Sequence, residues 1–154
     1  MIASVLDRKG PFDGIIAFSQ GTVVAAVAAT LLHGRARFQA FLDAQSRSDN
    51  VASYPRSFLK LQHPPFRFAI LYAGRVGRGR FYDWWYEPSI NTPFLLFVGL
   101  MDPIVEHEER DAVSERLLSH PTSAMVVHRG SHHVPTDKAS IDAAIAFVTD
   151  VLRP

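Results

Sequence analysis

Short runs of apolar residues recur along the chain and are typical of buried strands. They occupy residues 15–18, 66–72, 93–100 and 123–128, and β-branched and aromatic side chains are frequent in them. The runs are continuous rather than alternating between apolar and polar residues, which favours strands that are covered on both faces. We therefore expect four buried strands.

Helical patterns lie between most of these runs. Residues 22–32 are rich in Ala and Val and apolar nearly all round, which predicts a buried helix. Residues 139–152 place apolar side chains at helical spacing and predict a closing amphipathic helix. A more polar helix is expected at residues 106–118, one or two helical turns at 2–8 and 38–42, and loops at 46–55 and 74–92.

The order of these elements predicts an α/β domain. Strands are followed by helices along most of the chain, and buried strands connected in this way form a parallel sheet with helices on both faces. A length of 154 residues corresponds to about one domain with a sizeable hydrophobic core. We therefore expect a single domain over residues 1–154.

Composition and charge exclude several classes of function. The 16 basic and 15 acidic residues give a net charge of +1, so no strong field favours nucleic acid or an anionic membrane. No apolar run is long enough to span a bilayer, and Asp7, Arg8 and Lys9 stand where a signal peptide would be apolar. We expect a cytoplasmic protein, with the nucleus as the alternative. The chain has no Cys, which excludes thiolate metal sites and a Cys nucleophile.

The strongest chemical signal is the pentapeptide Ala17-Phe18-Ser19-Gln20-Gly21, between the first strand and the buried helix. It fits the G-x-S-x-G nucleophile elbow with Ala in the first position. The small residues Ala17 and Gly21 permit a tight turn that places Ser19 at a helix N-terminus. There the backbone N–H of Gln20 can donate to an oxyanion. The competing interpretation is a serine that only caps the helix.

A serine nucleophile needs a histidine base and an acid that orients the base, and α/β-hydrolases carry them in the order Ser, acid, His. Asp102 directly follows the third apolar run, and His132 follows the fourth. Residues that follow parallel strands gather at the carboxyl edge of the sheet, where ligands bind. The three residues therefore predict a catalytic triad. Another acid, such as Asp111, is the alternative partner of His132.

These segments resemble the family of serine hydrolases (FSH) within the α/β-hydrolases. Residues 10–21 are similar to its GPFDG and GFSQG elbow, with Ala17 in place of one Gly. Residues 99–105 resemble its G-x-x-D-x-x-V segment, and residues 128–135 its H-x-G-G-H-x-x-P segment, with Ser131 replacing the second Gly.

The resemblance implies an α/β-hydrolase fold without cofactor or metal, with Ser19 as nucleophile, Asp102 as acid and His132 as base. Members include fungal esterases and thioesterases that release polyketide chains. The resemblance therefore implies a small-molecule substrate, a carboxylic ester or acyl thioester, and a place in fungal secondary metabolism.

The resemblance also implies what surrounds the triad. Family members carry an upstream loop of the type L-H-G-x-G that supplies a second oxyanion N–H, and nothing before Phe12 is similar to it. We therefore expect the carboxyl-terminal part of the fold, which is the elbow strand and the three strands that follow it, flanked by helices. The elbow strand would then have an exposed edge. The alternative function is a catalytically impaired module whose edge is covered by a protein partner or by a second copy of the chain.

The segment after the second strand is rich in Arg and aromatic residues. In the resembled family it lies over the substrate entrance, which implies that Phe81, Trp84, Trp85 and Tyr86 line an acyl pocket. The alternative is that they belong to the core. Because the net charge is only +1, we expect Arg75, Arg78 and Arg80 to lie in a solvated loop rather than to bind nucleic acid. The alternative role of His128, His132 and His133 is metal binding, but they have no carboxylate beside them in the sequence, so we predict no metal site.

Overall fold

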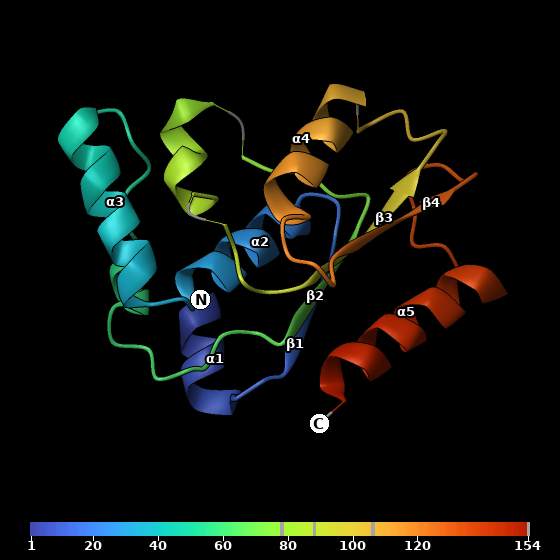
Figure 1. Cartoon of the computed structure of the whole chain (residues 1–154), viewed down its shortest axis with the longest axis horizontal. Helices are drawn as coiled ribbons and strands as arrows, with labels where there is room; N and C mark the ends of the chain where they lie inside the picture. The colour runs from blue at the N-terminus through green and yellow to red at the C-terminus, as the bar shows by residue number, and fades with distance from the viewer. Residues whose placement is uncertain (78, 88, 106, 154) are drawn as a thin grey trace.

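The computed structural model describes residues 1–77, 79–87, 89–105 and 107–153, without the side chains of residues 107 and 109. Arg78 of the predicted arginine-rich loop therefore lies outside the described residues. The elements follow the order shown in Figure 1: α1 (Ile2–Lys9), β1 (Gly14–Phe18), α2 (Gly21–Leu31), α3 (Arg35–Arg47), the short 3-10 helix η1 (Arg56–Phe58), β2 (Phe68–Tyr72), the 3-10 helix η2 (Arg80–Trp85), β3 (Phe94–Gly99), α4 (His107–Leu117), β4 (Ala124–His128) and α5 (Lys138–Leu152).

The described residues form one parallel sheet of four strands in the order β1-β2-β3-β4. Each strand thus lies beside its neighbour in the sequence, and helices occupy the connections β1–β2, β2–β3 and β3–β4. Because the strands run in the same direction, their carboxyl ends meet at one edge of the sheet. The α/β fold expected from the sequence, with the elbow strand and the three that follow it, is confirmed.

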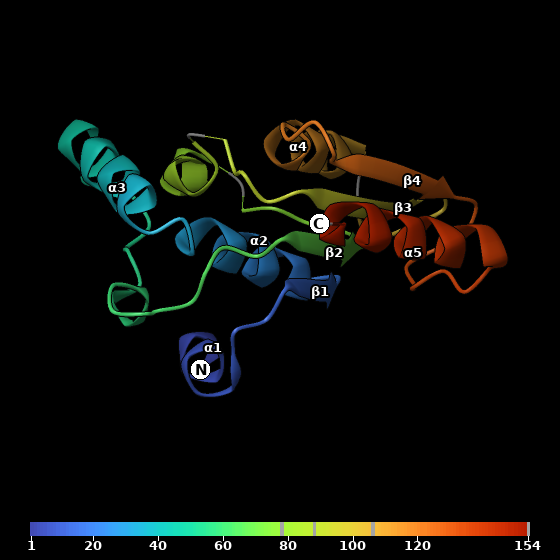
Figure 2. The ribbon, with the colours of Figure 1, turned by 60° about the horizontal axis from the view of Figure 1, so that its bottom comes forward.

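Helices cover both faces of the sheet. On one face, Ala29 of α2 and Leu117 of α4 are buried against Leu71 and Leu96 of the central strands. On the other face, Phe147 of α5 packs in a second apolar cluster with side chains of β2 and β3. Figure 1 shows α5 on one side of the sheet and α2 and α3 on the other, and Figure 2 shows α5 crossing in front of the strands. The central strands β2 and β3 are therefore buried from both sides.

Two elements differ from expectation. Residues 35–47 form a full helix, α3, where we expected only one or two helical turns. The sequence underestimates this helix because one of its polar residues is buried rather than exposed. Arg37 is buried and its Nη1 donates to the carbonyl oxygen of Trp84 at 3.2 Å. Residues 80–85, expected to be loop, form η2, which packs its aromatic side chains on α3 and the segment beside it.

The strand β1 lies at an edge of the sheet and exposes apolar side chains. Ile16 is 64% exposed and Phe18 is 41% exposed. Both point to the face that α5 covers over the central strands, but α5 does not extend over β1. Within the described residues, β1 has a hydrogen-bonded neighbour, β2, on one side only. None of the helices in this part of the chain combines the length and apolar character needed to cross a membrane.

Candidate active site

Ser19 stands on a sharp turn between β1 and α2. Its φ of 53° lies in the left-handed region, which side chains other than glycine rarely adopt. The turn is tied to the sheet because the Ser19 N–H donates to the carbonyl oxygen of Tyr72, at the end of β2, at 2.9 Å. This strained backbone lifts the Ser19 side chain out of the strand at the carboxyl edge of the sheet.

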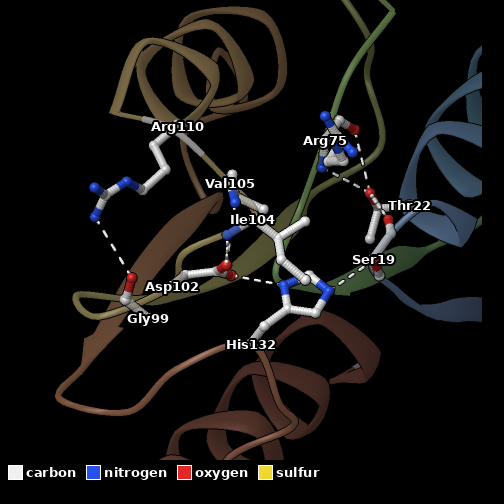
Figure 3. Close-up of polar contacts among 9 residues, drawn as sticks. All are labelled: Ser19, Thr22, Arg75, Gly99, Asp102, Ile104, Val105, Arg110 and His132. Atoms are coloured by element: carbon white, nitrogen blue, oxygen red, sulfur yellow. Dashed lines mark hydrogen bonds and ion pairs between the residues drawn. The ribbon is translucent and has the colours of Figure 1, made fainter.

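The Ser19 hydroxyl meets His132, which lies in the loop after β4. The Oγ of Ser19 is 2.8 Å from Nε2 of His132, and the other ring nitrogen, Nδ1, is 2.8 Å from Oδ2 of Asp102 (Figure 3). The ring of Phe18 lies against the imidazole, with centroids 5.0 Å apart. Residues 113 positions apart in the sequence are therefore joined in one hydrogen-bonded series.

Asp102 is held as an ionised acceptor. Its side chain is only 1% exposed, and its Oδ1 accepts hydrogen bonds from the backbone N–H groups of Ile104 at 2.8 Å and Val105 at 3.0 Å. Burial raises the pKa of Asp102, but the hydrogen bonds from His132 and from these two amides outweigh burial, so the pKa lies below its ordinary value.

The ionised carboxylate fixes the proton on the imidazole. An ionised carboxylate only accepts hydrogen bonds, so Nδ1 of His132 carries the proton that it donates to Asp102. Nε2 then has a free lone pair, which accepts the hydrogen bond of the Ser19 hydroxyl. In this tautomer, His132 is set to take the proton of Ser19. Asp102, and not Asp111, is the acid that pairs with His132.

Gly99, at the end of β3, lets the His132 loop approach the sheet. A side chain at this position would place its Cβ 2.7 Å from the carbonyl oxygens of both Gly130 and Ser131. Real Cβ atoms do not approach backbone this closely, so only glycine fits without moving the loop. Gly99 is the first position of the G-x-x-D pattern, but its role depends on contacts with the loop after β4, which the sequence does not display.

Gln20 occupies the N-cap position of α2 and is exposed. Among the described residues, no protein group accepts a hydrogen bond from its backbone N–H. A backbone N–H next to the nucleophile, at a helix N-terminus and on an exposed residue, is placed to donate to a developing oxyanion.

The four aromatic residues of the proposed acyl pocket have different environments. Trp84 and Tyr86 are buried: the indole N–H of Trp84 donates to the Ala52 carbonyl at 2.8 Å, and the Tyr86 hydroxyl accepts from the Gly77 N–H at 3.0 Å. These contacts fit the alternative that the two residues belong to the core. Phe81 is partly exposed, and Trp85 lines an apolar groove.

The groove beside Trp85 has a volume of about 270 Å³ and runs along α2. Val23, Val24 and Val27 of α2 form its wall, and Phe58 of η1 closes the opposite side. The groove therefore starts in the first turns of the helix that follows Ser19. In the described part of the chain, no group of three His, Asp or Glu side chains is arranged to hold a metal ion.

A Ser–His–Asp series at the carboxyl edge of a parallel sheet, with its serine on a strand-to-helix turn, defines the α/β-hydrolase class. Comparison with known proteins agrees with this class. The family model described as serine hydrolase (FSH1) matches residues 1–144. The chain belongs to this serine hydrolase family.

Individual relatives match over most of this chain but only part of their own length. Human esterase OVCA2 is 26% identical over 149 residues, which is 96% of this chain and 54% of the relative. A Schizosaccharomyces pombe protein named dihydrofolate reductase is 29% identical over 134 residues, which is 87% of this chain and 24% of the relative. The chain thus spans between about a quarter and a half of these curated relatives.

A solved structure has a similar fold. The crystal structure of acyl-protein thioesterase 2 from Zea mays matches with a TM-score of 0.56 and 18% sequence identity, over 99% of this chain and 62% of that chain. At this level of identity, the match supports the α/β-hydrolase fold.

Proposed function

We propose that the domain is a serine hydrolase that cleaves a carboxylic ester or an acyl thioester. The observation that carries the proposal is the hydrogen-bonded series from the Ser19 hydroxyl through His132 to the ionised Asp102. Relatives named as esterases and the thioesterase fold support the same reaction class.

In the proposed reaction, Nε2 of His132 takes the proton of Ser19 while the Ser19 Oγ attacks the substrate carbonyl carbon. The Gln20 N–H donates to the oxyanion of the tetrahedral intermediate. As the intermediate collapses, the bond from carbonyl carbon to leaving oxygen or sulfur breaks, and His132 protonates the leaving group. Asp102 stabilises the imidazolium throughout.

Water then attacks the acyl group on Ser19. His132 takes a proton from the water, and its return to Ser19 Oγ releases the carboxylic acid and regenerates the enzyme. Each cycle therefore consumes one ester or thioester and one water.

The apolar groove along α2 supports a substrate with an apolar acyl group. We extend the proposal to an acyl thioester or ester of secondary metabolism, which the resemblance to polyketide-releasing members suggests. The expected signature is a KM that decreases as the acyl chain lengthens in a series of p-nitrophenyl esters, an effect that Trp85→Ala weakens. A KM independent of chain length would contradict the assignment of the groove.

A fluorophosphonate probe tests the nucleophile directly. We expect the wild type to be labelled, with the modified peptide containing Ser19, and Ser19→Ala to lose the labelling. Ser4→Ala removes an exposed serine of α1 and should label like the wild type. Equal labelling of wild type and Ser19→Ala would overturn the proposal.

One observation favours a second function, a catalytically impaired module that acts by pairing with a second copy of itself. In the part of the chain that the structure describes, β1 is paired with a strand on one side only, and Ile16 and Phe18 are exposed beside its other edge. This function would appear as a folded dimer without Ser19-dependent labelling, whereas the hydrolase would be labelled in either oligomeric state.

A further inference from the structure

Thr22 connects the nucleophile turn to the loop that follows β2. It lies in the first turn of α2, and its side chain is fully buried. Its Oγ1 is 2.6 Å from the carbonyl oxygen of Ser19 and 2.8 Å from the backbone nitrogen of Arg75 (Figure 3). A single hydroxyl therefore bridges two backbone segments that are 53 residues apart.

The direction of these hydrogen bonds follows from the single proton of the hydroxyl. The Arg75 N–H can only donate, so Oγ1 accepts from it. The hydroxyl proton can be donated to the Ser19 carbonyl at 2.6 Å or to the Arg75 carbonyl at 3.2 Å, and we assign it to the Ser19 carbonyl because that contact is the shorter. Thr22 thus donates to the carbonyl oxygen of Ser19, while the hydrogen bond from the Arg75 N–H fixes the position of the Thr22 hydroxyl.

The Ser19 carbonyl is therefore held twice from the same side, by Oγ1 of Thr22 and by the Thr22 N–H at 3.0 Å. The peptide between Ser19 and Gln20 is planar and trans, so its C=O and N–H point in opposite directions. Holding the carbonyl toward Thr22 directs the Gln20 N–H to the opposite side, away from the interior and toward the exposed surface of the turn.

We propose that Thr22 is a positioning residue, which orients the Ser19–Gln20 peptide so that the Gln20 N–H faces the developing oxyanion. This inference rests on the proposed hydrolase function. It assigns a task to a residue outside the Ser–His–Asp series and the elbow pentapeptide.

The anchor that holds Thr22 is itself part of the sheet edge. Arg75 lies two residues after Ala73, whose φ of 50° is again in the left-handed region. The Ala73 N–H donates to the carbonyl oxygen of Phe97 in β3 at 2.9 Å. The turn after β1 is thereby connected, through Thr22 and the loop after β2, to the third strand.

The test compares Thr22→Val, which keeps the shape and removes the hydroxyl, with Thr22→Ser, which keeps the hydroxyl. Rates are measured on an ester substrate and expressed per active site titrated with a fluorophosphonate, so that unfolded protein does not count. We expect Thr22→Val to lower kcat about 10-fold with little change in KM, less than the loss of a whole oxyanion donor. Thr22→Ser should restore kcat to within about 2-fold of the wild type.

Thr30→Val is the matched control. Thr30 is also a fully buried threonine of α2, and its Oγ1 donates to the Ala26 carbonyl at 2.9 Å, within the helix. Thr30→Val should lower the stability of the protein, as Thr22→Val does, but leave kcat unchanged. If Thr22→Val does not fold, Thr22→Ala removes the same hydroxyl and leaves room for water.

The outcomes separate the two proposals. A wild type that neither turns over esters nor reacts at Ser19 contradicts the proposed function, and an active wild type with equal kcat in Thr22→Val contradicts the role of Thr22. Crystal structures of Thr22→Val and Thr22→Ser test the inference without turnover. An unchanged Ser19–Gln20 peptide in Thr22→Val would overturn it, and a rotated peptide there, with the wild-type orientation in Thr22→Ser, would support it.

Discussion

At the scale of single residues, the left-handed backbone of Ser19 positions the nucleophile but lowers the stability of the fold. A residue with a side chain costs about 1–2 kcal/mol in the left-handed region, and glycine does not carry this cost. We expect Ser19→Gly to be more stable than Ser19→Ala by about 0.5–1 kcal/mol, part of the gain being offset by the greater freedom of glycine in the unfolded chain. Urea unfolding of the two inactive variants measures the difference.

Ala17→Gly is the control for that comparison. Ala17 precedes the turn within β1, where extended backbone gives glycine no advantage. This variant should lose stability relative to the wild type, by about 0.5–1 kcal/mol. If Ser19→Gly were no more stable than Ser19→Ala, the turn would not be strained.

Asp102 determines which nitrogen of His132 carries the proton. In Asp102→Asn, the amide can donate to Nδ1, which shifts the imidazole proton to Nε2, where it blocks proton transfer from Ser19. We expect kcat to fall about 10⁴-fold while KM changes little. Steady-state kinetics measure the effect, and a loss below about 10-fold would contradict the assigned tautomer.

The lowered pKa of Asp102 also predicts how stability depends on pH. Because the folded-state pKa lies below the ordinary value of 3.8, the unfolded chain binds the proton more readily. The stabilisation is therefore fully present above pH 3.8 and is lost as the pH falls through the lower, folded-state pKa.

The free energy of unfolding of wild type minus that of Asp102→Asn measures this contribution. We expect the difference to stay constant down to about pH 5 and to shrink only in strongly acidic solution. A difference that already falls near neutral pH would mean that burial, and not hydrogen bonding, dominates the ionisation of Asp102.

The catalytic residues could be predicted from the sequence, but the contacts that position them could not. Ser19, Asp102 and His132 follow strands in a recognisable order, so each could be placed at the sheet edge from local patterns alone. The Thr22 hydroxyl instead bonds the backbone of Arg75, and such a pairing depends on how distant segments meet. Nothing in the local sequence around Thr22 indicates it.

At the scale of elements, the end of β3 and the loop after β4 are closely packed. Gly99→Ala would place a methyl group against the carbonyl oxygens of Gly130 and Ser131 and displace the loop that carries His132. Because a shift of about 1 Å in a catalytic group can cost 10²-fold, we expect a fall of that order in kcat. Kinetics with the ester substrate measure the loss of kcat, and thermal unfolding shows whether Gly99→Ala is still folded at the assay temperature.

Gly74→Ala provides the matched control, in the loop that follows β2. A Cβ there would meet only ordinary contacts, 3.6 Å from Val113 and 3.9 Å from Leu71. This variant should keep its activity. Wild-type kcat in Gly99→Ala would show that the loop can move without disturbing His132.

The elements themselves were predictable where their sequence pattern reflects burial. The central strands β2 and β3 are continuous apolar runs that are buried on both faces, as the sequence pattern indicates. The outer strands β1 and β4 have the same pattern but are partly exposed, so the apolar run predicts a strand better than it predicts burial. Helix α3 was underestimated because it buries Arg37, a residue that patterns assign to the surface. Helix η2 has no pattern of its own and is held by the packing of its aromatic side chains.

At the scale of the whole molecule, the open edge of β1 predicts self-association. Among the described residues, β1 pairs with β2 alone, and Ile16 beside its other edge is 64% exposed. Such an edge pairs readily with a second copy of the same strand. A lysine at position 16 would place a charge where two such edges meet, and charged side chains are a common protection of edge strands.

We therefore expect Ile16→Lys to reduce the concentration-dependent association of the isolated chain, measured by sedimentation velocity, without changing its circular dichroism spectrum. Ile145→Lys is the control, because Ile145 is similarly exposed at 60% but lies on α5, whose backbone hydrogen bonds are satisfied within the helix. If exposure of apolar surface alone caused association, both substitutions would reduce it equally. An effect confined to Ile16→Lys would identify the β1 edge as the surface through which copies of this chain meet, and no effect of either would exclude that edge.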